Sequence, residues 1–356
     1  MSDSRDHIAA LTSLRFVAAM AVVLFHSGGP GLTHSGALPT PLVNLLGNGY
    51  LGVPFFFVLS GFILTHVYQG RLATRDQTRR YTVARLARVY PVYLLALGLM
   101  AIWVPLEDWS LASFPQFVML QSWTPAWPGG AWFENWNIAA WTLSIELVFY
   151  LTFPWLLAAL DRLSISALWR ITVVSCGLIV VFRLPGIVRD QDLPYDWMRP
   201  IPMPVLRYPE FALGVALGLL SRRDAIPSRP GLLYAAMIAT VMLLAASLSR
   251  WVAPVACILF AVVIALAPGS VGNGVAGRIL KSRTFVLLGE ASYSLFLLQM
   301  PINILCKQVL GPTAGRYLFL PILLAFSILV FRYFEEPLRE AIRGRFRVQP
   351  KPAMMA

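Results

Sequence analysis

Two ionisable residues, Arg15 and His26, lie in the first long apolar stretch of the chain, residues 8–29. They are eleven residues apart, so at about 100° per residue both fall on one face of a helix, roughly 16 Å apart along its axis. Ionisable groups inside a lipid bilayer are costly unless paired or hydrated, which makes each a candidate site residue. A histidine can act as a general base, and an arginine can stabilise a developing negative charge. The structural alternative is that Arg15 extends its charge to the membrane surface while His26 lies at the interface.

Glu146 is a third ionisable residue in an apolar stretch, within the segment Trp141-Thr142-Leu143-Ser144-Ile145-Glu146. A carboxyl group at that depth must be protonated or paired with a cation. A buried ion pair with an arginine is the structural alternative, and it is compatible with a functional role. We therefore predict a polar site formed by Arg15, His26 and Glu146.

Two further arginines, Arg85 and Arg88, begin another apolar stretch directly after the basic segment 71–80. Because they are three residues apart, they share one face of a helix. The planar guanidinium group suits phosphate binding. Ordinary anchoring at the cytosolic membrane boundary is an equally good explanation of the charge alone.

The composition shows which elements must position these residues. Of 356 residues, 58% are hydrophobic and only 13% are charged, whereas soluble domains carry about a quarter charged residues. The apolar residues occur in runs close to the roughly 20 residues that a membrane-spanning helix needs. We expect an all-α, polytopic membrane protein, a single domain over residues 1–356 with about ten transmembrane helices. The expected spans are 8–29, 50–68, 84–105, 138–160, 168–186, 204–221, 231–248, 251–267, 285–305 and 317–335.

The arginines and lysines predict the orientation. With the N-terminus in the cytosol, the cytosolic segments hold 18 of them and the outer segments hold 7, among them Arg183 and Arg207. Cytosolic loops are enriched in these residues, so we expect both termini in the cytosol. The net charge of +12 is explained by the membrane, and no module for nucleic acid is visible. Cys176, Cys257 and Cys306 have no metal-ligand spacing, so we expect no metal site.

Taken in order, these residues resemble the acyltransferase-3 family of membrane acyltransferases, which includes O-antigen, exopolysaccharide and nodulation-factor acylases. The resemblance extends over essentially the whole chain. Its landmarks here are Arg15 and His26 with ten residues between them, Phe55–Phe62, Arg85 and Arg88 followed by Tyr90-Pro91, Trp141–Tyr150, Ser292–Leu295 and Phe334–Pro337.

The resemblance implies roles for individual residues. Arg15 and His26 correspond to the family's essential first-helix pair, in which the histidine acts in transfer, and Arg85 and Arg88 correspond to the arginines that hold acyl-CoA. One departure is Gln299, where many relatives have a histidine. We therefore expect no second catalytic histidine at that position.

The residues and the resemblance together predict a bacterial inner-membrane enzyme. It would transfer an acyl group, with acetyl expected, from cytosolic acyl-CoA to a hydroxyl of an extracytoplasmic or membrane-associated carbohydrate or glycolipid. His26 would be the general base, Glu146 would orient it or stabilise its cationic form, and Arg15 would line the donor path or stabilise the oxyanion. No bound cofactor is expected. The alternatives are a transporter or flippase that uses the same polar residues as a substrate path, and a non-catalytic membrane partner.

Overall fold

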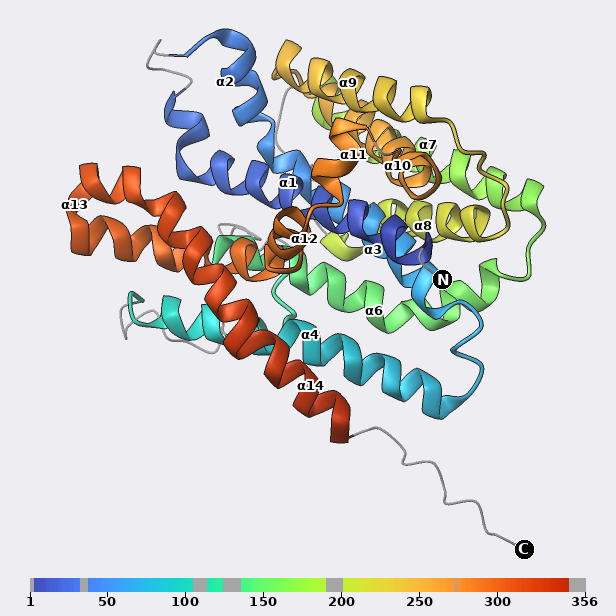
Figure 1. Ribbon diagram of the computed structural model, residues 1–356, viewed down its shortest axis with the longest axis horizontal. Helices are drawn as coiled ribbons and strands as arrows, with labels where there is room; N and C mark the ends of the chain where they lie inside the picture. Colours follow the sequence, from blue (N-terminus) through green and yellow to red (C-terminus); the bar gives the residue numbers. More distant parts are fainter. Residues whose placement is uncertain are drawn as a thin grey trace, which may run out of the picture.

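The computed structural model describes residues 3–32, 38–104, 114–123, 136–189, 201–272 and 274–345, and these contain helices and no strand (Figure 1). The longest helices lie side by side, with shorter helices at their ends. The elements are α1 (Asp3–Leu32), α2 (Thr40–Gly47), η1 (Gly49–Leu51), α3 (Gly52–Tyr68), α4 (Arg75–Ala101), α5 (Phe114–Phe117), η4 (Ile138–Ala140), α6 (Trp141–Leu160), α7 (Ile165–Arg189), α8 (Met203–Arg222), α9 (Pro230–Ala246), α10 (Val252–Ser270), α11 (Val275–Leu280), α12 (Arg283–Glu290), α13 (Ser292–Val330), η5 (Phe331–Glu335) and α14 (Glu336–Arg345).

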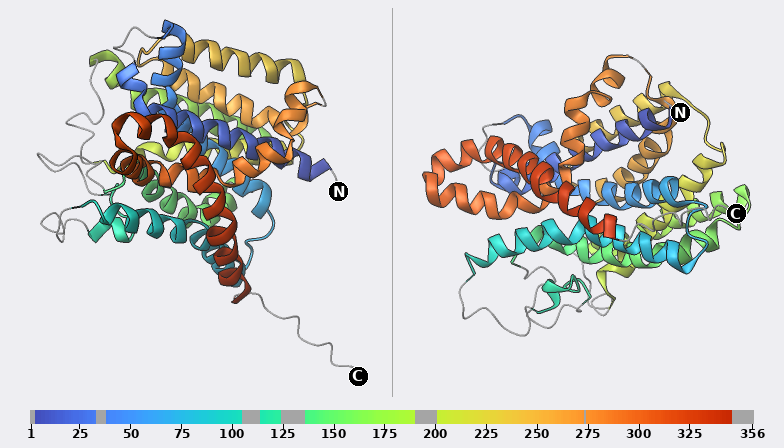
Figure 2. Two further views of the ribbon diagram at one scale, coloured as in Figure 1. Left: turned by 60° about the vertical axis from the view of Figure 1, so that its left-hand side comes forward. Right: turned by 60° about the horizontal axis from the view of Figure 1, so that its bottom comes forward.

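Eight helices in the described part of the chain are long and apolar enough to cross a membrane. Two features account for the difference from the ten expected spans. Helix α9 has 17 residues, just below the length of the others, and α13 folds back on itself at Gly311, where φ is +79°. The two arms of α13 lie side by side in Figures 1 and 2, and Gly315 of the second arm lies against the carbonyl group of Cys306 in the first. The expected all-α, polytopic membrane fold is confirmed.

The expected span 285–305 differs from the structure in its first turns. The chain divides at Ala291 into the short helix α12 and the long helix α13. Gly289 of α12 lies so close to α1 that a Cβ atom there would overlap the carbonyl group of Thr12. The packing of α12 against α1 therefore separates it from the straight run of α13, a tertiary effect that apolar content does not reveal.

Glycines bring the central helices into backbone contact. A Cβ atom at Gly61 of α3 would overlap the carbonyl oxygen of Phe211 in α8, and one at Gly214 of α8 would overlap the carbonyl oxygen of Val58 in α3. Small residues at such crossings are typical of membrane helices, where close van der Waals packing holds the bundle together. The glycine of the stretch Phe55–Phe62, one of the landmarks of the resemblance, thus serves helix packing.

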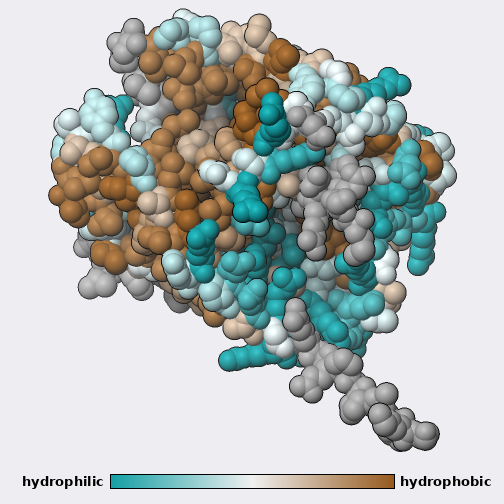
Figure 3. Space-filling view, in the orientation of Figure 1, coloured by the Kyte–Doolittle hydropathy of each residue, from teal (hydrophilic) through white to brown (hydrophobic). Residues whose placement is uncertain are grey.

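The surface divides into an apolar part and a charged part. Figure 3 shows hydrophobic surface over α13 and hydrophilic surface around α14. Large apolar side chains such as Trp155 and Val173 are about 70% exposed, as expected where lipid is the solvent. Exposed arginines, including Arg79, Arg80 and Arg343, gather where α14 lies beside the beginning of α4.

Candidate functional site

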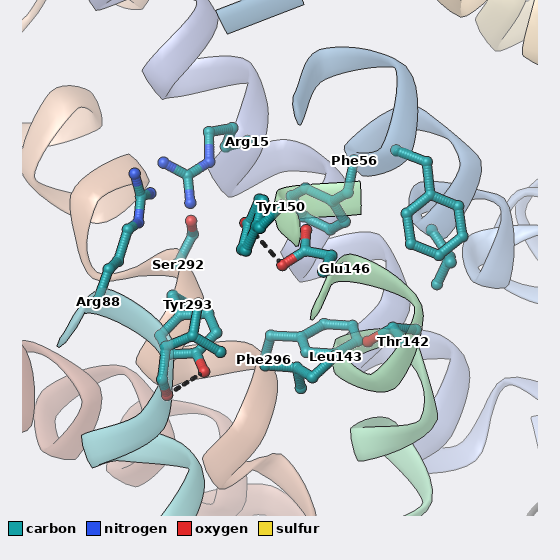
Figure 4. A pocket seen from close by; sticks show the side chains of 13 residues that line it. Arg15, Phe56, Arg88, Thr142, Leu143, Glu146, Tyr150, Ser292, Tyr293 and Phe296 are labelled. Carbon is teal, nitrogen blue, oxygen red and sulfur yellow. Dashed lines mark hydrogen bonds between the residues drawn. The ribbon is translucent and has the colours of Figure 1, made fainter. Parts of the chain in front are cut away.

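Arg15, Arg88 and Glu146 meet at a cavity of about 60 Å³ in the middle of the bundle (Figure 4). We call this the arginine cavity. Helix α1 supplies Arg15, α4 supplies Arg88 and α6 supplies Glu146. The remaining wall is mostly apolar and aromatic, and consists of Val53, Phe56, Phe57, Val89, Thr142, Leu143, Tyr150, Ser292, Tyr293 and Phe296. Three helices distant in sequence thus place two cations and one carboxyl group around one cavity.

The two arginines of this cavity form no ion pair with a described acidic residue, although Glu146 and Glu335 lie near enough to attract both electrostatically. Neither Arg15 nor Arg88 forms an ion pair or a hydrogen bond there, and Glu146 instead accepts a hydrogen bond of 2.9 Å from the Tyr150 hydroxyl. In Figure 4 the two guanidinium groups lie on the same side of the cavity, near Ser292. Like charges held close together in a low-dielectric interior favour binding of an anion between them.

His26 lies at a second cavity, of about 70 Å³, which we call the histidine cavity. Val53 and Phe296 line both cavities, so these two side chains form the wall between them. The helix that carries His26 ends its straight run directly after it, at Gly28, where φ is +151°, a conformation that glycine adopts without steric cost. His26 therefore stands at the end of the straight part of α1, beyond Arg15.

Gln299 of α13 determines how the imidazole of His26 is held. Its amide nitrogen donates to the carbonyl oxygen of Phe296 at 2.7 Å, which turns its amide oxygen toward His26. That oxygen accepts from Nδ1 of His26 at 3.0 Å. Because Nδ1 must then carry the hydrogen, Nε2 carries the lone pair. An imidazole held in one tautomer with a basic nitrogen is what a general base requires.

A third and larger cavity, of about 810 Å³, opens where α3, α4 and α14 meet. It is lined by Tyr68, Arg71, Gln77, Arg80, Tyr81, Val83, Ala84, Glu340, Arg343 and Gly344, and we call it the basic cavity. Its α4 wall begins with a capping box in which Thr74 and Gln77 bond each other's backbone amides. Tyr81 lines this cavity and donates to the carbonyl of Tyr150, a residue of the arginine cavity. The arginine cavity thus neighbours both others: this hydrogen bond links its wall to that of the basic cavity, and it shares two residues with the histidine cavity.

Arg85 does not reach the arginine cavity. Its Nη2 atom donates to the hydroxyl of Tyr68 at 3.2 Å, and its guanidinium carbon lies 5.3 Å from the centre of the same ring. Arg85 is thereby held against a wall residue of the basic cavity, while Arg88, one turn further along α4, faces the arginine cavity.

Of the five residues singled out from the sequence, the structure brings Arg15, Arg88 and Glu146 together. His26 lies in the adjoining cavity and Arg85 beside the basic cavity. The expected partnership of Glu146 with His26 is not seen, because Glu146 bonds Tyr150 and His26 bonds Gln299. The catalytic and binding roles of all five stay predictions.

Sequence reasoning missed a second charged cluster. Glu210 of α8 is buried and contacts Arg183 of α7 at 3.2 Å and Arg207 of α8 at 3.0 Å. Both arginines were expected in outer segments, but each lies within a helix and lines the histidine cavity. Applying the criterion of ionisable groups in apolar stretches to residues 204–221 would have found Glu210.

Comparison with known proteins agrees with the geometry. The sequence model of the acyltransferase-3 family, described as an acyltransferase domain, matches residues 8–333. The acyltransferase MdmB of Streptomyces mycarofaciens is 26% identical over 335 residues, which cover 86% of this chain and 81% of that protein. The O-acetyltransferase OatA of Staphylococcus aureus is 22% identical in an alignment of 384 positions, gaps included, that covers 98% of this chain but only 60% of that protein. No solved structure matches the chain.

The family match runs from the beginning of α1 into η5, so it leaves out α14, which forms one wall of the basic cavity. The residues that line the arginine and histidine cavities fall inside it. The resemblance inferred from the ordered motifs is thus confirmed over nearly the whole chain. This polytopic membrane protein belongs to the acyltransferase-3 family and is an acyltransferase.

Proposed function

We propose that this chain transfers an acyl group, with acetyl expected, from cytosolic acyl-CoA to a hydroxyl group of an extracytoplasmic or membrane-associated carbohydrate. The observation that carries the proposal is the succession of three cavities, in which cationic side chains lead from the bundle end near α14 to His26. The name of OatA, an O-acetyltransferase, supports oxygen as the acyl acceptor. The chain spans 60% of OatA, so the reaction of that whole protein is a guide only.

The basic cavity suits the nucleotide end of the donor. Arg71, Arg80 and Arg343 supply cations to a space of about 810 Å³, and guanidinium groups bind phosphate with charge-assisted hydrogen bonds. Tyr68, already in contact with Arg85, offers an aromatic surface beside them. In the proposed orientation this end faces the cytosol of a bacterial cell, where acyl-CoA is made, and both termini are cytosolic.

The arginine cavity suits the thioester end. A pantetheine chain is long and thin, so it can pass between helices while the charged nucleotide stays outside the bilayer. Arg15 and Arg88, which form no ion pair among the described residues, would stabilise the oxyanion that forms when the thioester carbonyl is attacked.

His26 would perform the proton transfers. Its Nε2 would take the hydroxyl proton of the acceptor as the oxygen bonds the carbonyl carbon. The carbon–sulfur bond then breaks, and the CoA thiolate takes the proton from the imidazolium and leaves as the thiol. Loss of a general base costs about 10²–10⁴-fold in rate.

The test replaces His26 with Gln, which keeps a polar side chain but cannot take a proton near neutral pH. Cells in which the gene has been deleted would be supplied with the wild-type protein or a variant. Their surface glycans would be compared by mass spectrometry, with acyl content expressed per amount of membrane-inserted protein. We expect His26→Gln to be as inactive as His26→Ala. The matched control is His66→Gln, because His66 lies on α3 outside the three cavities. Substantial acylation by His26→Gln would remove His26 from the proposed role.

A further inference from the structure

The histidine cavity has a charged wall that proton transfer by His26 does not need. Arg183 and Arg207 line it together with His26, Tyr50 and Trp141. They come from α7 and α8, which are packed against each other, and the arginine cavity lies on the other side of Val53 and Phe296. The charged wall therefore belongs to the histidine cavity and not to the arginine cavity on the proposed donor path.

Glu210 holds the two arginines but does not neutralise them both. Its Oε1 atom accepts from Nη2 of Arg183 and Nη1 of Arg207, while its Oε2 atom is buried without a hydrogen-bond partner. The side chain of Glu210 is only 2% exposed, against 12% for Arg183 and 17% for Arg207. The carboxylate therefore lies behind the two guanidinium groups, which are the members of the cluster that reach the cavity.

Among the described residues the cluster carries one positive charge in excess, since two arginines share one carboxylate. Each arginine uses a single N–H group in its bond to Glu210, and the rest have no partner among the described residues. A guanidinium group has five N–H donors in a planar fork that matches a carboxylate. Charge left unbalanced inside a membrane protein is costly, so a purely structural ion cluster would be expected to balance.

We propose that Arg183 and Arg207 bind a carboxylate carried by a substrate, so that the enzyme prefers an acidic substrate over its neutral counterpart. The inference rests on the proposed transfer function. The carboxylate could belong to the acceptor sugar, as in a uronic acid, or to the far end of a dicarboxylic acyl group. In either case, ion pairing at this wall holds the substrate beside Nε2 of His26.

The test uses purified protein in lipid nanodiscs with two donors, acetyl-CoA and succinyl-CoA, and two acceptors, methyl β-D-glucoside and methyl β-D-glucuronide. CoA release above hydrolysis without acceptor gives kcat/KM for each pair. We expect one acidic substrate to exceed its neutral counterpart, and which one does identifies the source of the carboxylate. A lost charged hydrogen bond is worth about 1.5–3 kcal/mol, so Arg207→Gln should reduce that preference by about 10- to 140-fold.

Three control variants keep this result interpretable. Arg207→Lys retains the charge without the fork and should retain part of the preference. Arg183→Gln should act like Arg207→Gln and serves if one of them fails to fold. Arg170→Gln changes an exposed arginine on α7, the helix that carries Arg183, and should leave the preference as in wild type. An equal loss for acidic and neutral substrates would assign the arginines to catalysis and overturn the inference.

A binding measurement separates this inference from the proposed function. The thermal unfolding midpoint of the protein would be measured in the presence of glucuronide and of glucoside, and in the presence of succinyl-CoA and of acetyl-CoA. The two values of each pair would then be compared. Stabilisation by one acidic compound that is lost in Arg207→Gln, without any turnover, would support the carboxylate site while refuting transfer. Turnover without an acidic preference would support transfer and refute the site. If neither turnover nor selective stabilisation is found, the inference fails as well.

Discussion

Gln299 is predicted to act as a positioning residue for His26. Its side chain is 1% exposed and holds the imidazole through one hydrogen bond of 3.0 Å, with its own amide fixed by a bond of 2.7 Å to Phe296. Gln299→Met keeps a similar shape but removes the acceptor. A neutral hydrogen bond contributes about 0.5–1.5 kcal/mol, which corresponds to about 2- to 13-fold in rate at 1.36 kcal/mol per tenfold.

The loss should appear in kcat rather than in KM, because Gln299 lines neither the arginine nor the histidine cavity. CoA release by purified protein, at saturating and at low donor concentration, separates the two constants. Gln299→Glu keeps an acceptor for Nδ1 and should recover part of kcat. Gln308→Met changes an exposed glutamine on the same helix and is the matched control.

Two results would refute this reasoning. A wild-type kcat in Gln299→Met would show that the hydrogen bond does not orient the base. Equal losses of kcat in the Met and Glu variants, with matching drops in the thermal unfolding midpoint, would show that Gln299 serves only the packing of α13. Measuring the unfolding midpoint together with kcat distinguishes these outcomes from the expected one.

Three further predictions concern donor binding, packing and orientation. Arg343→Ala, which removes a cation from the basic cavity, should weaken CoA binding by about 10- to 140-fold in isothermal titration, because one charged hydrogen bond is lost. Arg170→Gln on α7 should leave CoA binding unchanged. Gly214→Ala should lower the thermal unfolding midpoint, because the new Cβ atom would overlap the carbonyl of Val58 and overpacking costs about 1–3 kcal/mol. Gly98→Ala should leave the midpoint unchanged, because the space at its Cβ position is open. Ser249 and Thr74 are both exposed, so each can be replaced by Cys in a variant without the native cysteines. A membrane-impermeant thiol reagent added outside the cell should label Ser249→Cys and not Thr74→Cys. The reverse labelling pattern would overturn the proposed orientation.

The fold class followed from the sequence because the solvent determines it. Runs of about 20 apolar residues with few charges have to be helices in a bilayer, where every backbone group must be bonded within the segment. Two features of the bundle did not follow. The reversal of α13 at Gly311 and the separation of α12 from α13 depend on which surfaces pack together, and apolar content is the same whether a helix continues or folds back.

For the site, the sequence by itself identified residues whose charge is costly in a membrane, and Arg15, Arg88 and Glu146 do share a cavity. It did not determine the partners. Helical periodicity relates only residues on the same helix. The hydrogen bond from His26 to Gln299, in contrast, joins α1 to α13 across 273 residues. Likewise, Glu210 forms an ion pair with an arginine of α7 as well as with one of its own helix. Contacts between helices depend on how close the helix axes lie and how each helix is rotated about its axis. For α3 and α8, the close approach at Gly61 and Gly214 determines both. The residue types therefore determined which chemistry is available to this protein. Helix packing determined how these residues are arranged around three neighbouring cavities.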